Sequence, residues 1–262
     1  MDIINVIVLG IIQGLTEFLP VSSSGHLEIA QAILGEKKTG SENLLLTVVL
    51  HAATACSTIF VFRQDIGKLI SNLLKTNSPE SKYSLLIIVS MVPSVIVGLF
   101  FIGRIETLFG GALNLVGVML ILTGIILLVA NRAKNSNKTI GKKEALIIGL
   151  AQAFAIIPGV SRSGATISTA VLLGLDKEHA ARFSFLMVIP LILGKMTQDI
   201  FSGKITEAHT DLHIIIIGFL VAFVVGVIAC KWMIKIVKQS QLSYFSFYCC
   251  IVGFLVLLFP FL

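Results

Sequence analysis

The sequence predicts an all-α polytopic membrane protein with six full transmembrane helices and two re-entrant broken-helix hairpins. The chain has 262 residues, of which 56% are hydrophobic and only 13% are charged. A soluble domain averages about 25% charged residues, so this chain cannot cover a water-facing surface and has to be solvated by lipid. Its longest apolar runs match the thickness of a bilayer, which needs roughly 20 residues of helix.

Six apolar runs predict full transmembrane helices: 43–62, 84–102, 112–130, 181–200, 212–230 and 242–261. Two other regions, 2–34 and 143–174, each hold two apolar stretches of about 11–15 residues, which is too short to cross a bilayer comfortably. A polar break separates the two stretches, Pro20-Val-Ser-Ser-Ser-Gly25 in the first region and Pro158-Gly-Val-Ser-Arg-Ser-Gly164 in the second. Non-helical backbone at membrane depth is tolerated only inside the protein, so each region predicts a re-entrant hairpin with a buried break.

The two broken regions are related to each other by a shift of 139 positions. This shift superposes Gly10 on Gly149, Gln13 on Gln152, Ser22 on Ser161, Ser24 on Ser163 and Gly25 on Gly164. Downstream, Gln64-Asp65-Ile66 matches Gln198-Asp199-Ile200 at a shift of 134. The chain is therefore predicted to be one membrane domain, 1–262, made of repeat one at 1–130 and repeat two at 143–262. A hairpin followed by three crossings switches faces, so the second repeat should be inverted.

The positive charges predict which face is cytoplasmic. Twenty Lys and Arg against fourteen Asp and Glu give a net charge of +6, but these positive charges sit in loops between apolar runs, which argues against a nucleic-acid partner. Four lie on the face with loops 35–42, 103–111 and 201–211. Fourteen lie on the face with loops 63–83, 131–143, 175–182 and 231–241. The second face is therefore predicted to be cytoplasmic, with both termini and the first hairpin on the outer side.

Other polar and sulfur-containing residues receive structural interpretations. The four cysteines contain no C-x-x-C pair and lie in or beside apolar segments, so they are interpreted as small apolar side chains. The histidines outside the breaks are interpreted as interfacial or structural: His51, His179, His209 and His213. Asp65 and Asp199 are interpreted as helix-end residues.

The second break carries an intramembrane charge, Arg162, which is costly and therefore indicates function. Ser161, Ser163 and Thr166 lie beside it, and a helix is expected to begin near Gly164. A guanidinium, hydroxyls and a helix N-terminus together suit a phosphate group.

The first break contributes a carboxylate and a histidine. Gln13 and Glu17 are four residues apart and share one helix face, while Ser23 and His26 follow the proline. Glu17 needs a partner inside the membrane, which could be Arg162, another cation or a metal. His26 can serve as a base, an acid or a ligand.

The strings Q-G-L-T-E-F-L-P-V-S-S-S-G-H (13–26) and P-G-V-S-R-S-G-A-T (158–166) closely resemble the undecaprenyl-diphosphate phosphatase family, integral-membrane enzymes also known for bacitracin resistance. The resemblance covers the whole chain in length, span count and both motifs. It implies hydrolysis of undecaprenyl diphosphate to undecaprenyl phosphate and inorganic phosphate, which recycles the lipid carrier of peptidoglycan synthesis at the bacterial inner membrane. It also implies a divalent cation, Mg²⁺ or Ca²⁺, and a polyprenyl diphosphate as the lipid partner; whether the chain forms a homodimer stays open.

The resemblance also assigns the site residues. It implies catalytic roles for Glu17, Ser23, His26 and Arg162, and diphosphate binding by Gln13, Ser161, Arg162, Ser163 and Thr166. Members of the family with Glu at the first motif position have two carboxylates there, whereas this chain has Gln13. Glu17, with Gln13 or His26 beside it, is therefore the candidate cation ligand.

Two mechanisms and two other functions stay open at this point. Ser23 could attack phosphorus, assisted by His26 or Glu17, or a metal-activated water could replace it. Inverted repeats with broken helices are also typical of transporters, which hydrolyse nothing. Ser24-Gly25-His26 echoes the type 2 phosphatidic-acid phosphatases, but that class has a histidine six residues after its arginine, where this chain has Ser168. Because the first hairpin enters from the outer face, the site is expected to open outward and laterally to lipid.

Overall fold

The computed structural model describes residues 2–35, 41–75, 78–101, 103–104, 107–108, 113–133, 138–201, 211–238 and 242–259. These ranges contain eleven α-helices and no strand beyond one isolated bridge. The helices are α1 (Ile3–Thr16), α2 (Ser23–Ile33), α3 (Ser41–Val61), α4 (Arg63–Ser71), α5 (Pro79–Phe100), α7 (Leu113–Asn131), α8 (Lys142–Phe154), α9 (Arg162–Leu172), α10 (Lys177–Phe201), α11 (Leu212–Lys238) and α12 (Leu242–Leu258).

The long helices confirm a multi-pass membrane protein. Helices α5, α7, α10 and α11 are long and apolar enough to cross a bilayer, and the bent pair of α3 with α4 adds a fifth crossing if it is one span. Helix α12 has 17 residues and falls among the shorter apolar helices. The six predicted spans all coincide with helices, but six full crossings stays a prediction.

Helix α4 lies where the sequence predicts a loop. It turns by 76° from the end of α3 and begins at Arg63. This segment is too polar to continue α3 through hydrocarbon, because it contains Arg63, Asp65 and Lys68. The helix axis therefore bends between α3 and α4. Asp65, interpreted as a helix-end residue, forms an ion pair with Arg182 near the start of α10. This pair ties α4 to the second half of the chain.

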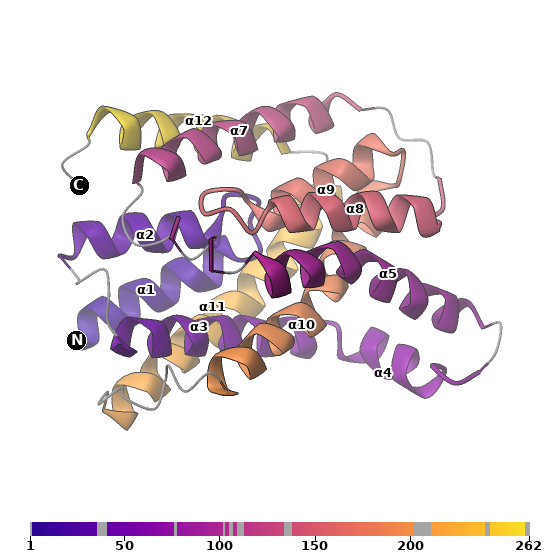
Figure 1. Ribbon diagram of the computed structural model, residues 1–262, viewed down its shortest axis with the longest axis horizontal. Coiled ribbons are helices and arrows are strands. Elements are labelled where there is room, and N and C mark those ends of the chain that lie inside the picture. The colour runs from indigo at the N-terminus through magenta and orange to yellow at the C-terminus, as the bar shows by residue number, and fades with distance from the viewer. Residues whose placement is uncertain are drawn as a thin grey trace.

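Two pairs of short helices occupy the predicted hairpin regions. Helices α1 and α2 have 14 and 11 residues, and α8 and α9 have 13 and 11. Helix α1 packs along α11, α8 packs along α5, and α12 packs along α7 (Figure 1). Both hairpins therefore lie against long helices contributed by the other half of the sequence.

The two breaks meet near the centre of the molecule (Figure 1). Gly159 in the second break has φ +91°, a conformation that L side chains rarely adopt. A Cβ on Gly159 would lie 2.7 Å from the carbonyl oxygen of Val116 on α7. A Cβ on Gly25 would lie 3.1 Å from the Cα of Gly159. Glycine at these two positions thus lets the breaks touch each other and α7.

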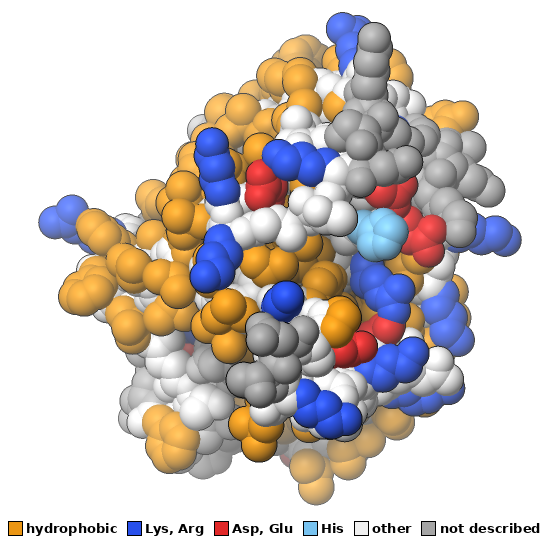
Figure 2. All heavy atoms as spheres, turned by 90° about the vertical axis from the view of Figure 1, so that its right-hand side faces the viewer, with side chains coloured by type: hydrophobic (Ala, Val, Ile, Leu, Met, Phe, Trp, Pro, Cys, Tyr) orange, Lys and Arg blue, Asp and Glu red, His pale blue; other side chains and the backbone are white. Residues whose placement is uncertain are grey.

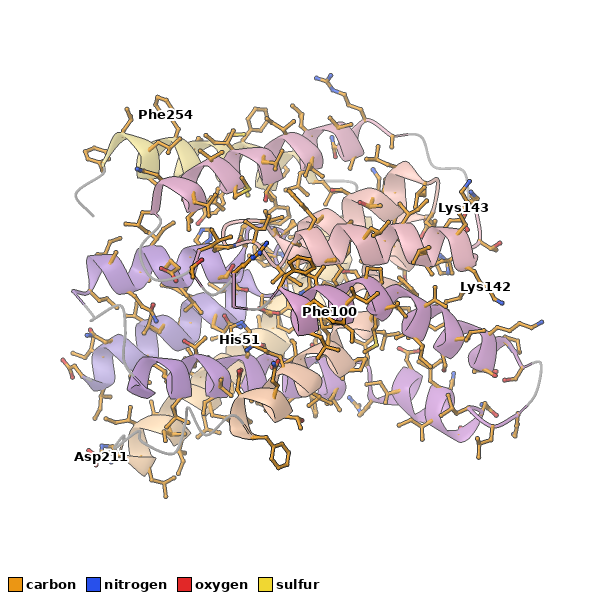
Figure 3. All side chains as sticks on the ribbon, viewed as in Figure 1. His51, Phe100, Lys142, Lys143, Asp211 and Phe254 are labelled. Atoms are coloured by element: carbon orange, nitrogen blue, oxygen red, sulfur yellow. The ribbon has the colours of Figure 1, made fainter. Side chains whose placement is uncertain are left out.

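Charged side chains gather at one end of the molecule. Figure 2 shows Lys and Arg side chains, with several acidic ones, on the end where α4 lies and α8 begins. Figure 3 shows Lys142 and Lys143 at this end and Asp211 at the opposite end. Large apolar side chains are exposed elsewhere, such as Leu99 on α5 and Ile228 on α11, which fits helices that face lipid.

Candidate active site

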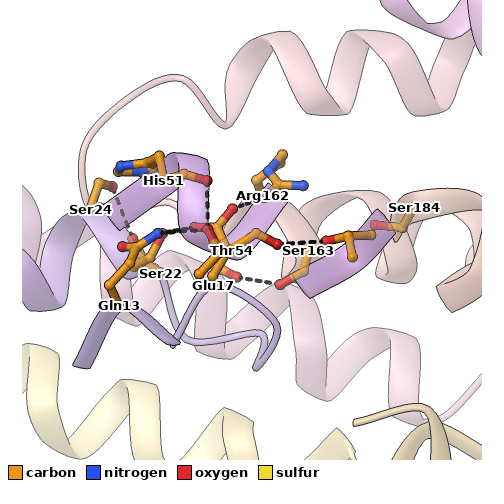
Figure 4. Close-up of polar contacts among 12 residues, drawn as sticks. Gln13, Glu17, Ser22, Ser24, His51, Thr54, Arg162, Ser163 and Ser184 are labelled. Carbon is orange, nitrogen blue, oxygen red and sulfur yellow. Dashed lines mark hydrogen bonds and ion pairs between the residues drawn. The ribbon is translucent and has the colours of Figure 1, made fainter. Parts of the chain in front are cut away.

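Glu17 is the residue at which both breaks converge. It follows the last residue of α1 directly, and it is buried, with 7% of its surface exposed. One carboxylate oxygen, Oε1, forms an ion pair with Arg162, the first residue of α9. The other oxygen, Oε2, accepts a hydrogen bond from Ser23 Oγ at 2.7 Å and another from Gln13 Nε2 at 3.0 Å. A buried carboxylate is stable only when paired and hydrogen-bonded, and Glu17 has both kinds of partner (Figure 4).

The first break is shaped to present Ser23. Ser22 has φ +72°, rare for a residue with a side chain, and its Oγ accepts a hydrogen bond from the N–H of Gly25 at 3.2 Å. This contact caps the N-terminus of α2 and makes Ser23 its first residue. The Ser23 hydroxyl therefore projects from a fixed helix end toward Glu17.

The second break presents Arg162 in the corresponding way. Ser161 Oγ accepts a hydrogen bond from the N–H of Gly164 at 3.0 Å, which makes Ser161 the N-cap of α9. Its own N–H donates to Thr123 Oγ1 of α7 at 3.1 Å. The cap holds Arg162 at a helix N-terminus, where the helix dipole also favours an anion.

The other hydroxyls of the second motif bind protein groups. Ser163 Oγ donates to the carbonyl oxygen of Leu19 in the first break at 3.2 Å. Thr166 Oγ1 lies 2.8 Å from the carbonyl oxygen of Arg162 and 2.6 Å from Ser184 Oγ on α10. Both side chains are almost fully buried. In this arrangement, Ser161, Ser163 and Thr166 shape the break around Arg162, and their predicted role as direct phosphate ligands stays a prediction.

His26 turns away from the other predicted catalytic residues. Its Nδ1 lies 2.9 Å from the carbonyl oxygen of Ser22, and its Nε2 lies 2.8 Å from the hydroxyl of Tyr248 on α12. Glu17, Ser23 and Arg162 thus form one contacting group, while His26 and Tyr248 form a second group beside it. Tyr248 was not predicted from the sequence, because a tyrosine in an apolar span is usually interfacial.

His51 lies closer to the site than its interpretation as an interfacial or structural residue suggests. It is on α3, one turn from Thr54, whose Oγ1 accepts a hydrogen bond from Gln13 Nε2 at 3.3 Å. His51 is also within electrostatic range of the Glu17 carboxylate, and Figure 4 shows it beside this group. Its Nδ1 donates to the carbonyl oxygen of Thr47 at 2.8 Å. The sequence holds a signal for this position, because His51, Thr54 and Thr58 are spaced to form a polar helix face within an apolar span.

Gln13 and Glu17 supply the oxygen atoms that could bind a divalent cation here. Gln13 Oε1 is buried and has no hydrogen-bond partner among the described residues, and the Glu17 carboxylate lies one turn away. The described part of the chain holds no cluster of three or more His, Cys, Asp or Glu suited to a metal. Amide and carboxylate oxygens are ligands that Mg²⁺ and Ca²⁺ prefer, so Gln13 Oε1 and Glu17 would hold such a cation together with water and phosphate oxygens. Gln13 is the better second ligand, because both His26 ring nitrogens have other partners.

Comparison with known proteins identifies the family of this chain. Residues 6–255 match the family described as bacitracin resistance protein BacA. The chain belongs to this family. A relative from Christiangramia forsetii, named undecaprenyl-diphosphatase, is 55% identical and aligns over 100% of this chain and 99% of its own length. Relatives with the same name from Bacteroides thetaiotaomicron and Methanobrevibacter smithii are 47% and 38% identical, each over 98% of this chain and 99% and 97% of their own lengths. Because the chain belongs to the BacA family, Ser24-Gly25-His26 does not indicate a type 2 phosphatidic-acid phosphatase.

Proposed function

We propose that this chain hydrolyses undecaprenyl diphosphate through a serine nucleophile that is activated by Glu17 and faces Arg162. The product is undecaprenyl phosphate, the lipid carrier of cell-wall synthesis, and inorganic phosphate is released. Family membership and full-length relatives named undecaprenyl-diphosphatase support the reaction. The observation that carries the mechanism is the contact of Ser23 and Arg162 with the two oxygens of one buried carboxylate.

Ser23 is the nucleophile because its hydroxyl already donates to a base. Its Oγ attacks the terminal phosphorus, and its proton passes to Glu17 Oε2, 2.7 Å away. The bond between the terminal phosphorus and the bridging oxygen breaks, and the electron pair stays on the oxygen of undecaprenyl phosphate. Glu17 then gives its proton to solvent and is ionised again. Water attacks the phosphoserine, Glu17 takes a proton from this water and passes it to Ser23 Oγ as the bond between phosphorus and Oγ breaks, and inorganic phosphate is released. A bound cation would neutralise phosphate oxygens beside Gln13 and Glu17.

Arg162 binds the terminal phosphate. Its guanidinium is planar and has five donors, so it can hold Glu17 and two phosphate oxygens with different N–H groups. Transferred phosphoryl groups carry charge over their outer oxygens in the transition state, where a fixed cation in a water-poor site is most effective. The N-terminus of α9 adds a positive dipole end at the same place.

The matching contacts of the two breaks support an inverted repeat. Ser22 Oγ accepts a hydrogen bond from the N–H of Gly25, and Ser161 Oγ accepts one from the N–H of Gly164. The shift of 139 relates the residues of one pair to those of the other. Helix α1 packs on α11 and α8 packs on α5, so each hairpin rests on a long helix of the other half. A pseudo-twofold relation within the membrane plane exchanges these contacts. With the positive charges on the cytoplasmic side, the first hairpin and the catalytic Ser23 open toward the outer face.

Phosphate release by the purified protein in detergent tests the function. Wild-type protein should release inorganic phosphate from undecaprenyl diphosphate, and a chelator should suppress the release. Ser24→Ala is a matched control, because Ser24 is next to Ser23 and its hydroxyl lies 3.4 Å from Ser22 Oγ, away from Glu17. Failure of the wild-type protein to release phosphate would contradict the function and leave transport, which the inverted repeat also suits, as the better explanation.

A further inference from the structure

Tyr248 contacts His26 in two ways. The two rings are stacked, with centroids 5.5 Å apart and planes 11° apart, and the Tyr248 hydroxyl lies 2.8 Å from His26 Nε2. The carbonyl oxygen of Ser22 can only accept a hydrogen bond, so the Nδ1 that lies 2.9 Å from it carries the ring hydrogen. Nε2 is then the lone-pair nitrogen, and Tyr248 is the donor. Both ring nitrogens of His26 are thus hydrogen-bonded, and Nε2, which carries the lone pair, faces α12.

Helix α12 is anchored to the first break at the next residue as well. The Sγ of Cys249, a fully buried side chain, donates to the carbonyl oxygen of Pro20 at 3.7 Å. Two successive residues of α12 therefore contact the break that presents Ser23. This double contact fixes the Tyr248 hydroxyl relative to the catalytic group.

Tyr248 also borders the surface that faces lipid. On α12, Tyr244, Phe247 and Ile251 are 67%, 62% and 59% exposed, whereas Tyr248 is 43% exposed. The phenol therefore lies between an apolar helix surface and the polar break, an arrangement that amphipathic tyrosine favours. A polyprenyl chain in the bilayer would reach the break past this residue.

The order of groups in the substrate matches the order of groups in the protein. The terminal phosphate lies at Ser23 and Arg162, and the lipid chain must lie outside in the bilayer, so the lipid-linked phosphate lies between them. Ser23 and His26 are three residues apart on α2 and are neighbours on the helix surface, about 5–6 Å apart at Cβ. His26 and Tyr248 are therefore next to the nucleophile on the side toward lipid.

We propose that Tyr248 and His26 form the subsite that binds the lipid-linked phosphate, the group that leaves with the polyprenyl chain. This inference deepens the proposed function and rests on it. The Tyr248 hydroxyl, which now donates to His26 Nε2, donates instead to a phosphate oxygen, and His26 Nε2 takes up a proton from water and donates it to the same phosphate. Tyr248 thus distinguishes a phosphate that carries a lipid from a free one, because inorganic phosphate needs only the Arg162 side of the site.

Competitive inhibition by two probes tests the subsite. Release of labelled terminal phosphate from undecaprenyl diphosphate is measured against undecaprenyl phosphate and against inorganic phosphate as inhibitors. Tyr248→Phe keeps the ring stack and removes only the hydroxyl, so the inhibition constant of undecaprenyl phosphate should rise roughly fivefold while that of inorganic phosphate stays unchanged. Tyr244→Phe, one turn along the same exposed surface, is the matched control and should leave both constants unchanged.

Direct binding of labelled undecaprenyl phosphate to the detergent-solubilised protein needs no turnover and should show the same difference between the two variants. Equal affinity of Tyr248→Phe and Tyr244→Phe for undecaprenyl phosphate would overturn the subsite, as would an equal loss of affinity for both probes in Tyr248→Phe. A wild-type protein that binds undecaprenyl phosphate through Tyr248 but releases no phosphate would contradict the proposed function and not the subsite.

Discussion

Ser23 and Glu17 are joined across the first break by a hydrogen bond of 2.7 Å between a hydroxyl and a buried carboxylate. The bond pairs the first residue of α2 with the residue that directly follows α1. A hydroxyl that already donates to a carboxylate is positioned to lose its proton when it attacks phosphorus.

The first prediction tests this pair. Ser23→Ala should reduce phosphate release from undecaprenyl diphosphate by about a thousandfold or more, because no other hydroxyl replaces the nucleophile. Ser24→Ala should stay within about threefold of wild type, since its contact with Ser22 is long and weak. Initial rates of phosphate release at saturating lipid measure both. Substantial turnover by Ser23→Ala would favour a water nucleophile.

Glu17 and Gln13 should respond in opposite ways to exchange of acid and amide. Glu17→Gln removes the base and the partner of Arg162, so activity should fall by at least about a hundredfold. Gln13→Glu should be tolerated, because a second carboxylate beside Glu17 is compensated by tighter binding of a cation. The measurement is phosphate release against cation concentration. If Glu17→Gln keeps wild-type rates and cation dependence, Glu17 serves the structure and not the reaction.

Arg162→Lys keeps the charge but should lose about a hundredfold in activity. A lysine ammonium is a point charge and cannot reach Glu17 and two phosphate oxygens in one plane. The loss should appear in kcat as well as in KM, since the interaction strengthens in the transition state. Arg182→Lys, at the ion pair with Asp65 on α4, is the control and should retain activity. Equal behaviour of the two variants would remove Arg162 from phosphate binding.

His51 should matter for rate although the sequence suggests an interfacial or structural residue. It lies near the Glu17 carboxylate and on the same helix face as Thr54, which binds Gln13. His51→Ala should lower kcat by about tenfold, equivalent to about 1.4 kcal/mol in the barrier. His179→Ala is the control, because His179 is exposed and contacts Asp176 outside the site. Equal kcat values for the two variants would show that His51 has a structural role only.

Labelling of single cysteines should reveal the topology. In a background without native cysteines, a membrane-impermeant thiol reagent added to intact cells should label loops 35–42 and 201–211 but not loop 131–143. The bias of four against fourteen positive charges motivates this expectation. Labelling of loop 131–143 together with loop 35–42 from outside would contradict both the orientation and the inverted repeat.

The sequence by itself determined the class of fold and the chemistry of the two breaks. Apolar runs must become helices in lipid, because every backbone N–H and C=O group there needs an internal partner. The polar breaks were recognisable for a related reason: charged groups such as Arg162 and Glu17 are too costly in hydrocarbon unless each has a partner inside the protein. Local motifs also encoded the caps at Ser22 and Ser161, which depend on contacts three residues away.

Tertiary structure decided which groups share the site. Arg162 and Glu17 are 145 residues apart, and only the packing of the two hairpins brings their side chains into contact. The same packing places His51 beside Glu17 and carries Tyr248 to His26, 222 residues away. A lone histidine or tyrosine in an apolar helix has no local partner that reveals its role. Its role follows from which helix faces meet, and that is settled by side-chain packing across the whole molecule.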